Sequence, residues 1–212
     1  MTKGVIFDFD GTLTELTLDF GHLRKEIETL ARRYVVDNEI RSREGQYIIE
    51  MIYSVEKRLQ GSGVTFRQEA FAKLRELEME ASKGKDVYPY TRDVLETLRK
   101  RGVKVGVITR SHSDVLNLVF PDMGKFVDAI VTRDDVREVK PHPNHGRKVL
   151  RLLGVGAHEA ILVGDHPTDV LAGQAAGMKT AGVLSGRTTR EAFEVVGATY
   201  ILDDIRGIPD LL

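Results

Sequence analysis

The chain has 212 residues, enough for one sizeable hydrophobic core and a smaller additional unit. Its 31 basic and 32 acidic residues give a formal net charge of −1, which does not favour nucleic acid or an anionic membrane surface as a partner. The absence of cysteine excludes disulfides and thiolate metal sites. No apolar segment is suited to a cleavable leader or a membrane span, so we expect a cytoplasmic protein.

The first predicted element is a short strand, and a helical block follows it. Residues 3–9 are mostly apolar, with β-branched and aromatic side chains, and Gly11 ends them, which is typical of a buried strand. Between about residues 15 and 85, apolar residues recur at helical spacing in three groups. These groups are Leu23, Ile27, Leu30 and Tyr34, then Ile48, Ile52, Val55 and Leu59, then Phe71, Leu74 and Leu77. The stretch therefore predicts helices without a strand.

Beyond Pro89 the pattern alternates between helices and strands. Helices are predicted over residues 91–101, 112–119, 144–153 and 167–176, and strands over 103–109, 128–132, 160–165, 179–183 and 199–202. Thr91 is the expected N-cap of the first of these helices. The alternation predicts an α/β fold, a Rossmann-like parallel sheet with helices on both faces. We expect a core domain of residues 1–14 and 88–212, with residues 15–87 forming a helical domain inserted after the first strand.

Polar residues that suit chemistry stand at the carboxyl ends of the predicted strands, where open parallel sheets bind ligands. These residues are Asp8, Asp10, Thr109, Arg110, Lys140, Asp165 and Asp169. Carboxylates held close together repel one another unless a positive charge joins them. Because the available ligands are oxygen atoms and cysteine is absent, the sequence favours Mg²⁺ over Zn²⁺ as that charge.

The sequence DFDGT explains why two acids would follow an apolar strand. Asp8 and Asp10 lie two residues apart, so in extended backbone they point the same way, and one attacks an electrophile while the other moves a proton. Gly11 permits a tight turn whose N–H groups suit anionic oxygens. Thr109 and Lys140 would hold the remaining oxygens and neutralise charge in the transition state. This set suits phosphoryl transfer through an aspartyl phosphate.

The order of these segments resembles the four motifs of the haloacid dehalogenase superfamily. They are DFDGTL, the strand that ends in Thr109, Lys140 before Pro141, and GDHPTD. The resemblance implies that Asp8 is the nucleophile and a metal ligand, and that Asp10 is the general acid and base and lends a backbone carbonyl to the metal. It implies a phosphate site of Gly11, Thr109, Arg110 and Lys140, a direct metal ligand in Asp165, and in Asp169 a partner that supports the ligands.

The inserted helices resemble the C1 cap of that superfamily, which closes over the site. Two positions depart from the superfamily's usual residues. His166 stands where Ser or Thr is frequent, and Arg110 stands where Asn is frequent. The acid at position 10 marks phosphoryl transfer in this superfamily, because the dehalogenases proper lack it.

The leading interpretation is a Mg²⁺-dependent phosphatase of small phosphorylated metabolites, similar in layout to phosphoglycolate phosphatases and acting as a monomer or homodimer. A β-phosphoglucomutase-like isomerase and a pyrophosphatase are alternatives on the same core. A receiver domain that is phosphorylated on aspartate is an alternative from another class, although the acids of receivers are distributed differently over the strands. A binding protein with an idle site is a further alternative.

Overall fold

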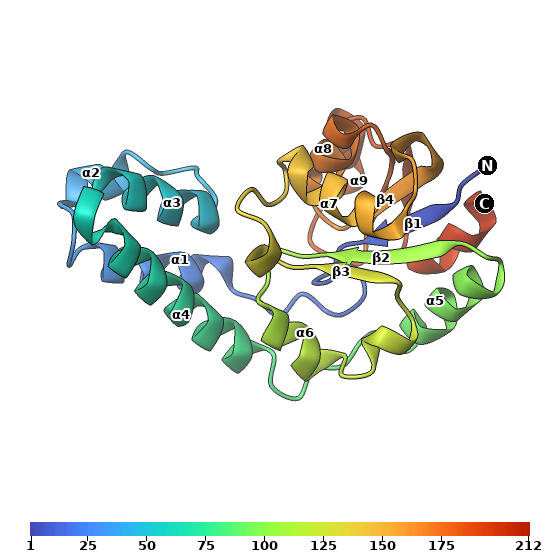
Figure 1. Ribbon diagram of the computed structural model, residues 1–212, viewed down its shortest axis with the longest axis horizontal. Helices are drawn as coiled ribbons and strands as arrows, with labels where there is room; N and C mark the ends of the chain where they lie inside the picture. Colours follow the sequence, from blue (N-terminus) through green and yellow to red (C-terminus); the bar gives the residue numbers. More distant parts are fainter. The chain divides into compact units, whose positions relative to one another are not determined.

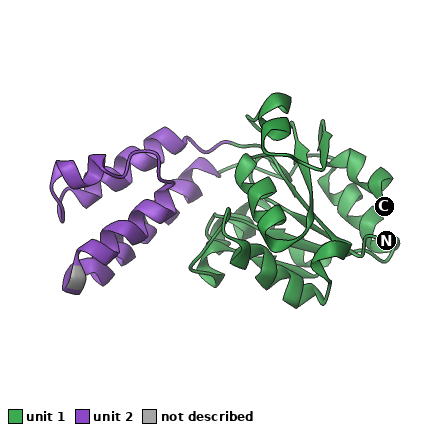
Figure 2. Ribbon diagram, turned by 90° about the horizontal axis from the view of Figure 1, so that it is seen from above, with its two compact units in different colours: residues 1–16, 83–212 green, residues 17–82 purple. Residues whose placement is uncertain are grey.

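A computed structural model describes the whole chain apart from the side chain of Gln60. The chain divides into two compact units, shown in different colours in Figure 2. Unit 1 comprises residues 1–16 and 83–212, and unit 2 comprises residues 17–82. The polar residues singled out in the sequence all belong to unit 1, so that unit is described first.

Unit 1 is built on one sheet of six parallel strands in the order β3-β2-β1-β4-β5-β6. The strands are β1 (Gly4–Phe7), β2 (Lys104–Ile108), β3 (Ala129–Val131), β4 (Ala160–Gly164), β5 (Lys179–Val183) and β6 (Tyr200–Leu202). The chain starts in the middle of the sheet, builds outward through β2 and β3, and then crosses back to β4 on the other side of β1. This change of direction places the ends of β1, β2 and β4 side by side at the point where such sheets bind ligands.

Helices cover both faces of this sheet, with α7 and α8 on one face and α5 and α6 on the other (Figure 1). The helices of unit 1 are α5 (Thr91–Lys100), α6 (Ser113–Val119), α7 (Pro143–Leu153), α8 (Pro167–Ala176) and α9 (Arg190–Val195). Because both faces are covered, β1 and β4 are apolar runs that are buried along their whole length. The predicted α/β fold, a parallel sheet with helices on both faces, is confirmed.

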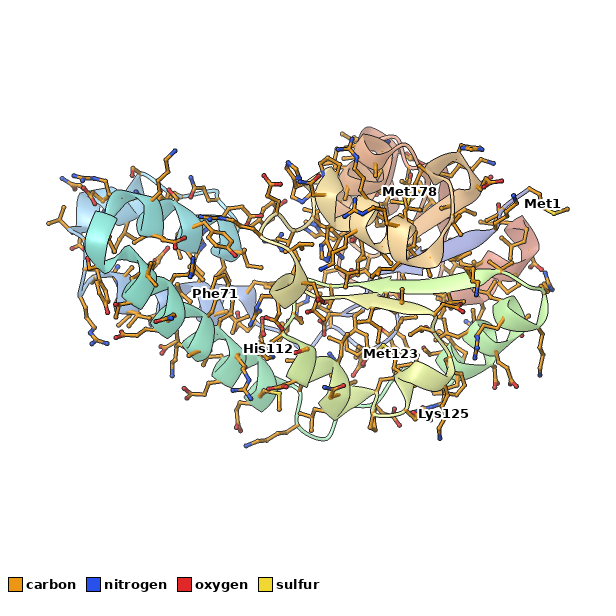
Figure 3. The ribbon with its side chains drawn as sticks, viewed as in Figure 1. Met1, Phe71, His112, Met123, Lys125 and Met178 are labelled. Atoms are coloured by element: carbon orange, nitrogen blue, oxygen red, sulfur yellow. The ribbon has the colours of Figure 1, made fainter. Side chains whose placement is uncertain are left out.

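The core between the sheet and α7 and α8 is made of aliphatic side chains. Ile6 of β1 and Leu162 of β4 meet Val149 of α7 and Ala172 of α8 there. Met178, which Figure 3 labels, completes this cluster just before β5. Burial of this kind stabilises the fold by about 25 cal/mol for each Å² of apolar surface removed from water. The core therefore gives the loops at the carboxyl ends of the strands a rigid base.

Unit 2 is helical throughout its regular structure. It contains α1 (Phe20–Ala31), α2 (Asp37–Arg41), α3 (Ile48–Arg58) and α4 (Gly63–Ala81). Most apolar positions at helical spacing in α1 and α3 are buried, although Leu30 and Ile48 are half-buried, and α4 packs against both helices. Edge-to-face ring pairs join Tyr34 to Phe66 and Tyr53 to Phe71, with centroids 5.4 and 5.5 Å apart. The role of this unit as a cap stays a prediction.

Several local features differ from the sequence-based expectations. Thr91 is the first residue of α5 and not its N-cap, a position that Tyr90 occupies. The Thr91 hydroxyl instead donates to the carbonyl of Leu13, at 2.7 Å, and so ties α5 to the loop after β1. The short helices α2 and α9 were not predicted, because five or six residues are too few for a helical period to show. Within the described residues, no helix combines the length and apolarity needed to cross a membrane.

Candidate active site

Most of the polar residues predicted at strand ends lie in the loops that follow β1, β2 and β4, whereas Lys140 lies between β3 and α7 and Asp169 lies in the first turn of α8. β1 continues past Phe7 through Asp8, whose N–H donates to the carbonyl of Val163 in β4 at 2.8 Å. Thr109 follows β2 directly, and its N–H donates to the carbonyl of Val131 in β3 at 3.1 Å. Asp165 follows β4 in the same way. The sheet therefore fixes the backbone positions of these three residues.

The turn after β1 is held by a second segment of the chain. Gly11 has φ of +85°, and its N–H donates to the carbonyl of Thr14 at 2.8 Å. The Thr14 hydroxyl donates to the carbonyl of Asp86 at 2.7 Å, and an antiparallel bridge pairs Thr14 with Val87. The segment around residue 86 is thus fastened beside the turn that carries Asp10.

A buried acidic cluster forms the centre of the site. It consists of Asp8, Asp165 and Asp169, whose side-chain oxygens lie within 4.8 Å of one another. The ammonium of Lys140 lies 2.6 Å from Asp8 Oδ1 and 2.6 Å from Asp169 Oδ1, and its side chain is 2% exposed. Two of the three carboxyl groups therefore share one ammonium, and no cation partner for Asp165 is found among the described side chains.

Two glycines leave the space that Asp165 needs. A Cβ atom on Gly11 or on Gly186 would overlap the Asp165 carboxylate, although the two glycines belong to different loops. Ser185, next to Gly186, donates its hydroxyl to the carbonyl of Gly11 at 2.7 Å and so joins the two loops. Bare backbone therefore borders Asp165 on two sides, and a small hard cation fits beside such a carboxylate better than a side chain does.

The electrostatics of the cluster show that negative charge is in excess. Burial raises the pKa of Asp8 to about 7, against the opposing effect of Lys140. Burial, together with the charges of Asp8 and Asp169, raises the pKa of Asp165 to about 9. Although burial opposes the charged form of Lys140, the two aspartates raise its pKa above the ordinary value. One further positive charge would relieve the cluster, and three oxygen ligands suit a hard divalent cation.

Asp10 lies beside this cluster in a different environment. The ammonium of Lys85 lies 2.9 Å from Asp10 Oδ1, and the side chains of Lys85 and Asp10 are 4% and 9% exposed. The Ser111 hydroxyl donates to Asp10 Oδ2 at 2.7 Å. Each carboxylate oxygen of Asp10 therefore has its own donor, and the Asp10 side chain is not part of the acidic cluster.

The predicted phosphate-binding residues lie at the same edge of the sheet. Thr109 is buried, and its Oγ1 accepts from the Ser111 N–H at 3.0 Å, which leaves the hydroxyl hydrogen to donate to a ligand. Arg110 is half-buried, and its carbonyl accepts from the Arg133 guanidinium at 3.1 Å. The Gly11 N–H closes the turn, so the binding of phosphate by Gly11 stays a prediction. The same holds for Arg110.

Asp169 has a structural and an electrostatic role together. It stands in the first turn of α8, where Asp169 Oδ2 accepts from the N–H of His166, the N-cap residue, at 3.1 Å. Its other oxygen pairs with Lys140. The His166 ring Nδ1 accepts from the Thr168 N–H at 3.2 Å, which is the contact that a Ser or Thr cap would make. The unusual residue at position 166 therefore preserves the start of the helix.

Comparison with known proteins decides the family. The sequence profile described as "Haloacid dehalogenase-like hydrolase" matches residues 5–183, which is well over half of the 212 residues. The chain belongs to the haloacid dehalogenase-like hydrolases. The resemblance seen in the motifs is thereby confirmed, and so is the expectation that the chain is an enzyme of this family.

Individual relatives of this hydrolase agree with the assignment. Pyrophosphatase PpaX of Bacillus cereus (strain AH820) is 40% identical over 130 residues, which cover 59% of this chain and 59% of that protein. The alignment thus spans about three-fifths of the curated relative. A hydrolase from Pseudomonas syringae has a TM-score of 0.72 at 24% identity, over 99% of this chain and 98% of that one. CbbY from Rhodobacter sphaeroides, in complex with phosphate, has a TM-score of 0.65 at 22% identity, over 97% and 95%. These two structures show the shared fold.

Some residues of this hydrolase's site were not found by sequence reasoning. Lys85 and Gly186 are brought to the site by loops far from the recognised motifs. Lys85 stands among other charged residues near the end of the helical block, which gives no signal of its own. Gly186 follows a predicted strand, as Gly11 does, and that shared placement is the one signal in the sequence that could have identified it.

Proposed function

We propose that the chain is a Mg²⁺-dependent phosphatase of small phosphorylated metabolites that works through a phosphoaspartate on Asp8. The observation that carries this proposal is the contact of Lys140 with Asp8 and Asp169, at 2.6 Å each, inside a buried acidic cluster. The ammonium favours the ionised form of the buried Asp8 carboxylate and orients it, which is what a carboxylate nucleophile needs. The neighbouring Asp10, outside the cluster, is placed to move a proton.

The first step forms a bond between an Asp8 oxygen and the phosphorus atom. The bond from phosphorus to the leaving oxygen breaks, and that oxygen takes a proton from Asp10 as it departs. Thr109 and Lys140 contact the oxygens of the transferred group and stabilise the charge that builds on them. Asp8 then carries the phosphoryl group, and Asp10 is a carboxylate again.

The second step returns the enzyme to its starting state. Asp10 takes a proton from water, the water oxygen bonds to phosphorus, and the bond between phosphorus and Asp8 breaks. Inorganic phosphate leaves, and the proton that Asp10 holds serves the next leaving group. The two steps together add one water molecule to the substrate, so no other reactant is needed.

The donor set fits a divalent cation. Asp8 and Asp165 would hold it with their carboxylates and Asp10 with its backbone carbonyl, while both oxygens of Asp169 already have donors in Lys140 and the His166 N–H. When bound, Mg²⁺ neutralises charge on the phosphoryl oxygens and offsets the excess negative charge of the cluster. The raised pKa of Asp165 supports this assignment, because burial and its two acidic neighbours oppose its ionisation where no cation is present.

The test is the release of inorganic phosphate from p-nitrophenyl phosphate and from a panel of metabolite phosphates, with and without Mg²⁺. We expect turnover that requires the ion, disappears with a chelator, and is lost in Asp8→Asn. The exposed Lys100→Met, on the surface of α5, serves as the matched control and should retain full activity. The absence of Mg²⁺-dependent turnover across the whole panel would overturn the proposal.

A pyrophosphatase is a second candidate on the same core. The relative that is 40% identical over 130 residues is named a pyrophosphatase, and inclusion of inorganic pyrophosphate in the panel tests this candidate. Free phosphate also separates both hydrolases from a mutase, which would release little. The role of unit 2 as a cap, the cytoplasmic location and the choice between monomer and homodimer stay predictions.

A further inference from the structure

Lys85 is a buried ammonium whose donors are mostly unused. It has three N–H donors, and Asp10 Oδ1, 2.9 Å away, is the one acceptor found for it among the described residues. Its side chain is only 4% exposed. Buried ammonium groups carry a large cost unless acceptors satisfy them, so an anionic oxygen that accepted from the two remaining donors would be strongly favoured.

The position of Lys85 is fixed by the backbone on its carboxyl-terminal side. The carbonyl of Asp86 accepts from the Thr14 hydroxyl at 2.7 Å, and the Tyr88 N–H donates to the carbonyl of Leu13 at 3.0 Å. The Tyr88 hydroxyl donates to the carbonyl of Ser185 at 3.2 Å. The residues that follow Lys85 are therefore attached both to the turn after β1 and to the loop after β5.

This placement puts a positive charge where the leaving group departs. In the proposed function, on which this inference rests, Asp10 gives its proton to the leaving oxygen. The Lys85 ammonium, 2.9 Å from Asp10 Oδ1, therefore lies beside the side chain that would protonate the leaving oxygen. Lys140, in contrast, contacts Asp8 and Asp169, so it serves the transferred phosphoryl group.

We propose that Lys85 selects substrates whose leaving group carries a negative charge beside the scissile oxygen, with phosphoanhydrides of the inorganic pyrophosphate type preferred. In the first step Asp8 bonds to one phosphorus and the bridging P–O bond breaks. The departing phosphate takes the proton of Asp10 on the former bridging oxygen, while Lys85 contacts its other oxygens. A carboxylate next to the scissile oxygen offers the same contact, so a phosphate ester of a hydroxy acid is the second source of this chemistry.

The experiment compares substrates that differ in the charge of the leaving group. Inorganic pyrophosphate releases a phosphate anion, phosphoglycolate releases an alcohol that carries a carboxylate, and p-nitrophenyl phosphate releases a group without an additional charged substituent. The value of kcat/KM is measured for each with Mg²⁺ and full-length protein. The variant Lys85→Gln keeps a hydrogen-bond donor for Asp10 and removes the charge, whereas Lys85→Arg keeps the charge.

We expect Lys85→Gln to lower kcat/KM for the preferred charged substrate at least about tenfold more than for p-nitrophenyl phosphate, which is typical of one lost charge-assisted hydrogen bond. Lys85→Arg should restore much of the preference, and Lys100→Met should leave it unchanged. A larger loss with pyrophosphate than with phosphoglycolate would assign the site to anhydrides, and the reverse would assign it to hydroxy-acid esters.

Three further results would overturn the inference, and a fourth case needs the other variant. An equal loss on all three substrates, complete loss included, would mean that Lys85 only positions Asp10, and it would overturn the selection of charge. If Lys85→Gln does not fold, as judged by thermal unfolding, the test uses the wild type and Lys85→Arg. Both must then favour the charged substrates over p-nitrophenyl phosphate in kcat/KM. A wild type that prefers p-nitrophenyl phosphate contradicts the inference alone, whereas a wild type that hydrolyses none of these compounds contradicts the proposed function as well.

Discussion

The two halves of the site differ in how their charges are balanced. In the half around Asp8, the cluster of three buried carboxyl groups has the single ammonium of Lys140, which contacts Asp8 and Asp169. In the half around Asp10, one carboxyl group has an ammonium from Lys85 and a hydroxyl donor from Ser111. The first half is short of positive charge and the second is balanced.

In the proposed function, this difference would allow one loop to carry two acids with separate tasks. The half that lacks positive charge would attract a cation, because a positive charge relieves a deficit that burial makes costly. The phosphoryl group is itself anionic, so it would depend on that cation and on Lys140. The balanced half keeps its carboxyl group oriented without help from an ion. Asp8 and Asp10 are about equally buried, so the difference between their environments comes from their hydrogen-bond and ion-pair partners.

Asp10→Asn should abolish proton transfer in the half around Asp10 and leave the half around Asp8 unchanged. An amide cannot accept a proton from water or give one to a leaving group, so we expect kcat to fall about a hundredfold to ten-thousandfold. The measurement is steady-state phosphate release from p-nitrophenyl phosphate. The matched measurement is the rise in melting temperature with Mg²⁺, which this variant should retain; loss of that rise would show that the two halves are not separate.

Lys140→Met should destabilise the half around Asp8. Removal of the ammonium leaves Asp8 and Asp169 buried without their partner, so the free energy of unfolding of the metal-free protein should fall by about 3 kcal/mol. Urea unfolding with a chelator measures this change. Mg²⁺ should recover part of the loss. A change below about 1 kcal/mol would show that the two pairs contribute little to the fold.

The pH dependence of stability should show that the half around Asp8 lacks positive charge. The pKa values of Asp8 and Asp165, about 7 and about 9, lie above the ordinary value of 3.8, so the folded protein binds more protons than the unfolded chain between those limits. Their contribution is therefore fully present below about pH 4 and is lost as the pH rises through 7 and 9. Thermal unfolding without metal should show a melting temperature that falls over this window, and Mg²⁺ should flatten the fall. A metal-free melting temperature that rises with pH would contradict these shifts.

Asp165→Asn should change stability the least of these variants, and it tests whether the half around Asp8 carries too much negative charge. It removes one acid from the crowded half and keeps its shape, so the metal-free protein should gain about 1 kcal/mol of stability, with a gain that grows with pH. The melting temperature at pH 8, with a chelator, measures it. The same variant should lose the stabilisation by Mg²⁺ and the turnover. A metal-free variant that is less stable than the wild type would show that Asp165 is not destabilised by its neighbours.

Much of this architecture was predictable from the sequence because it depends on local patterns. Asp8, Thr109 and Asp165 each follow an apolar run, and in a parallel sheet the ends of such runs meet at one edge. Lys140 lies in a longer loop, and it was recognised through the order of the motifs. Its contact with Asp169 was not predicted, because the sequence does not show where a flexible side chain ends.

Lys85 shows why the rest was not predictable. Its contact with Asp10 spans 75 positions of sequence and depends on how the residues after it pair with the turn after β1. No periodicity marks that pairing, and Gly84, which precedes Lys85 with φ of +72°, indicates a turn but not the segment with which the chain then pairs. Thr91 illustrates the same limit, since a residue typical of an N-cap instead donates to the carbonyl of Leu13, 78 positions away. Contacts between loops were therefore missed where contacts along strands were found.

The most direct test of the account is to trap the phosphoryl group on Asp8. Protein mixed with substrate and Mg²⁺ is quenched in acid, reduced with borohydride, which converts an aspartyl phosphate into homoserine, and analysed by peptide mass spectrometry. We expect homoserine at position 8, dependent on both substrate and Mg²⁺ and absent from Asp8→Asn. Turnover of the substrate with position 8 unmodified, or with homoserine at position 10 or 165, would contradict the account.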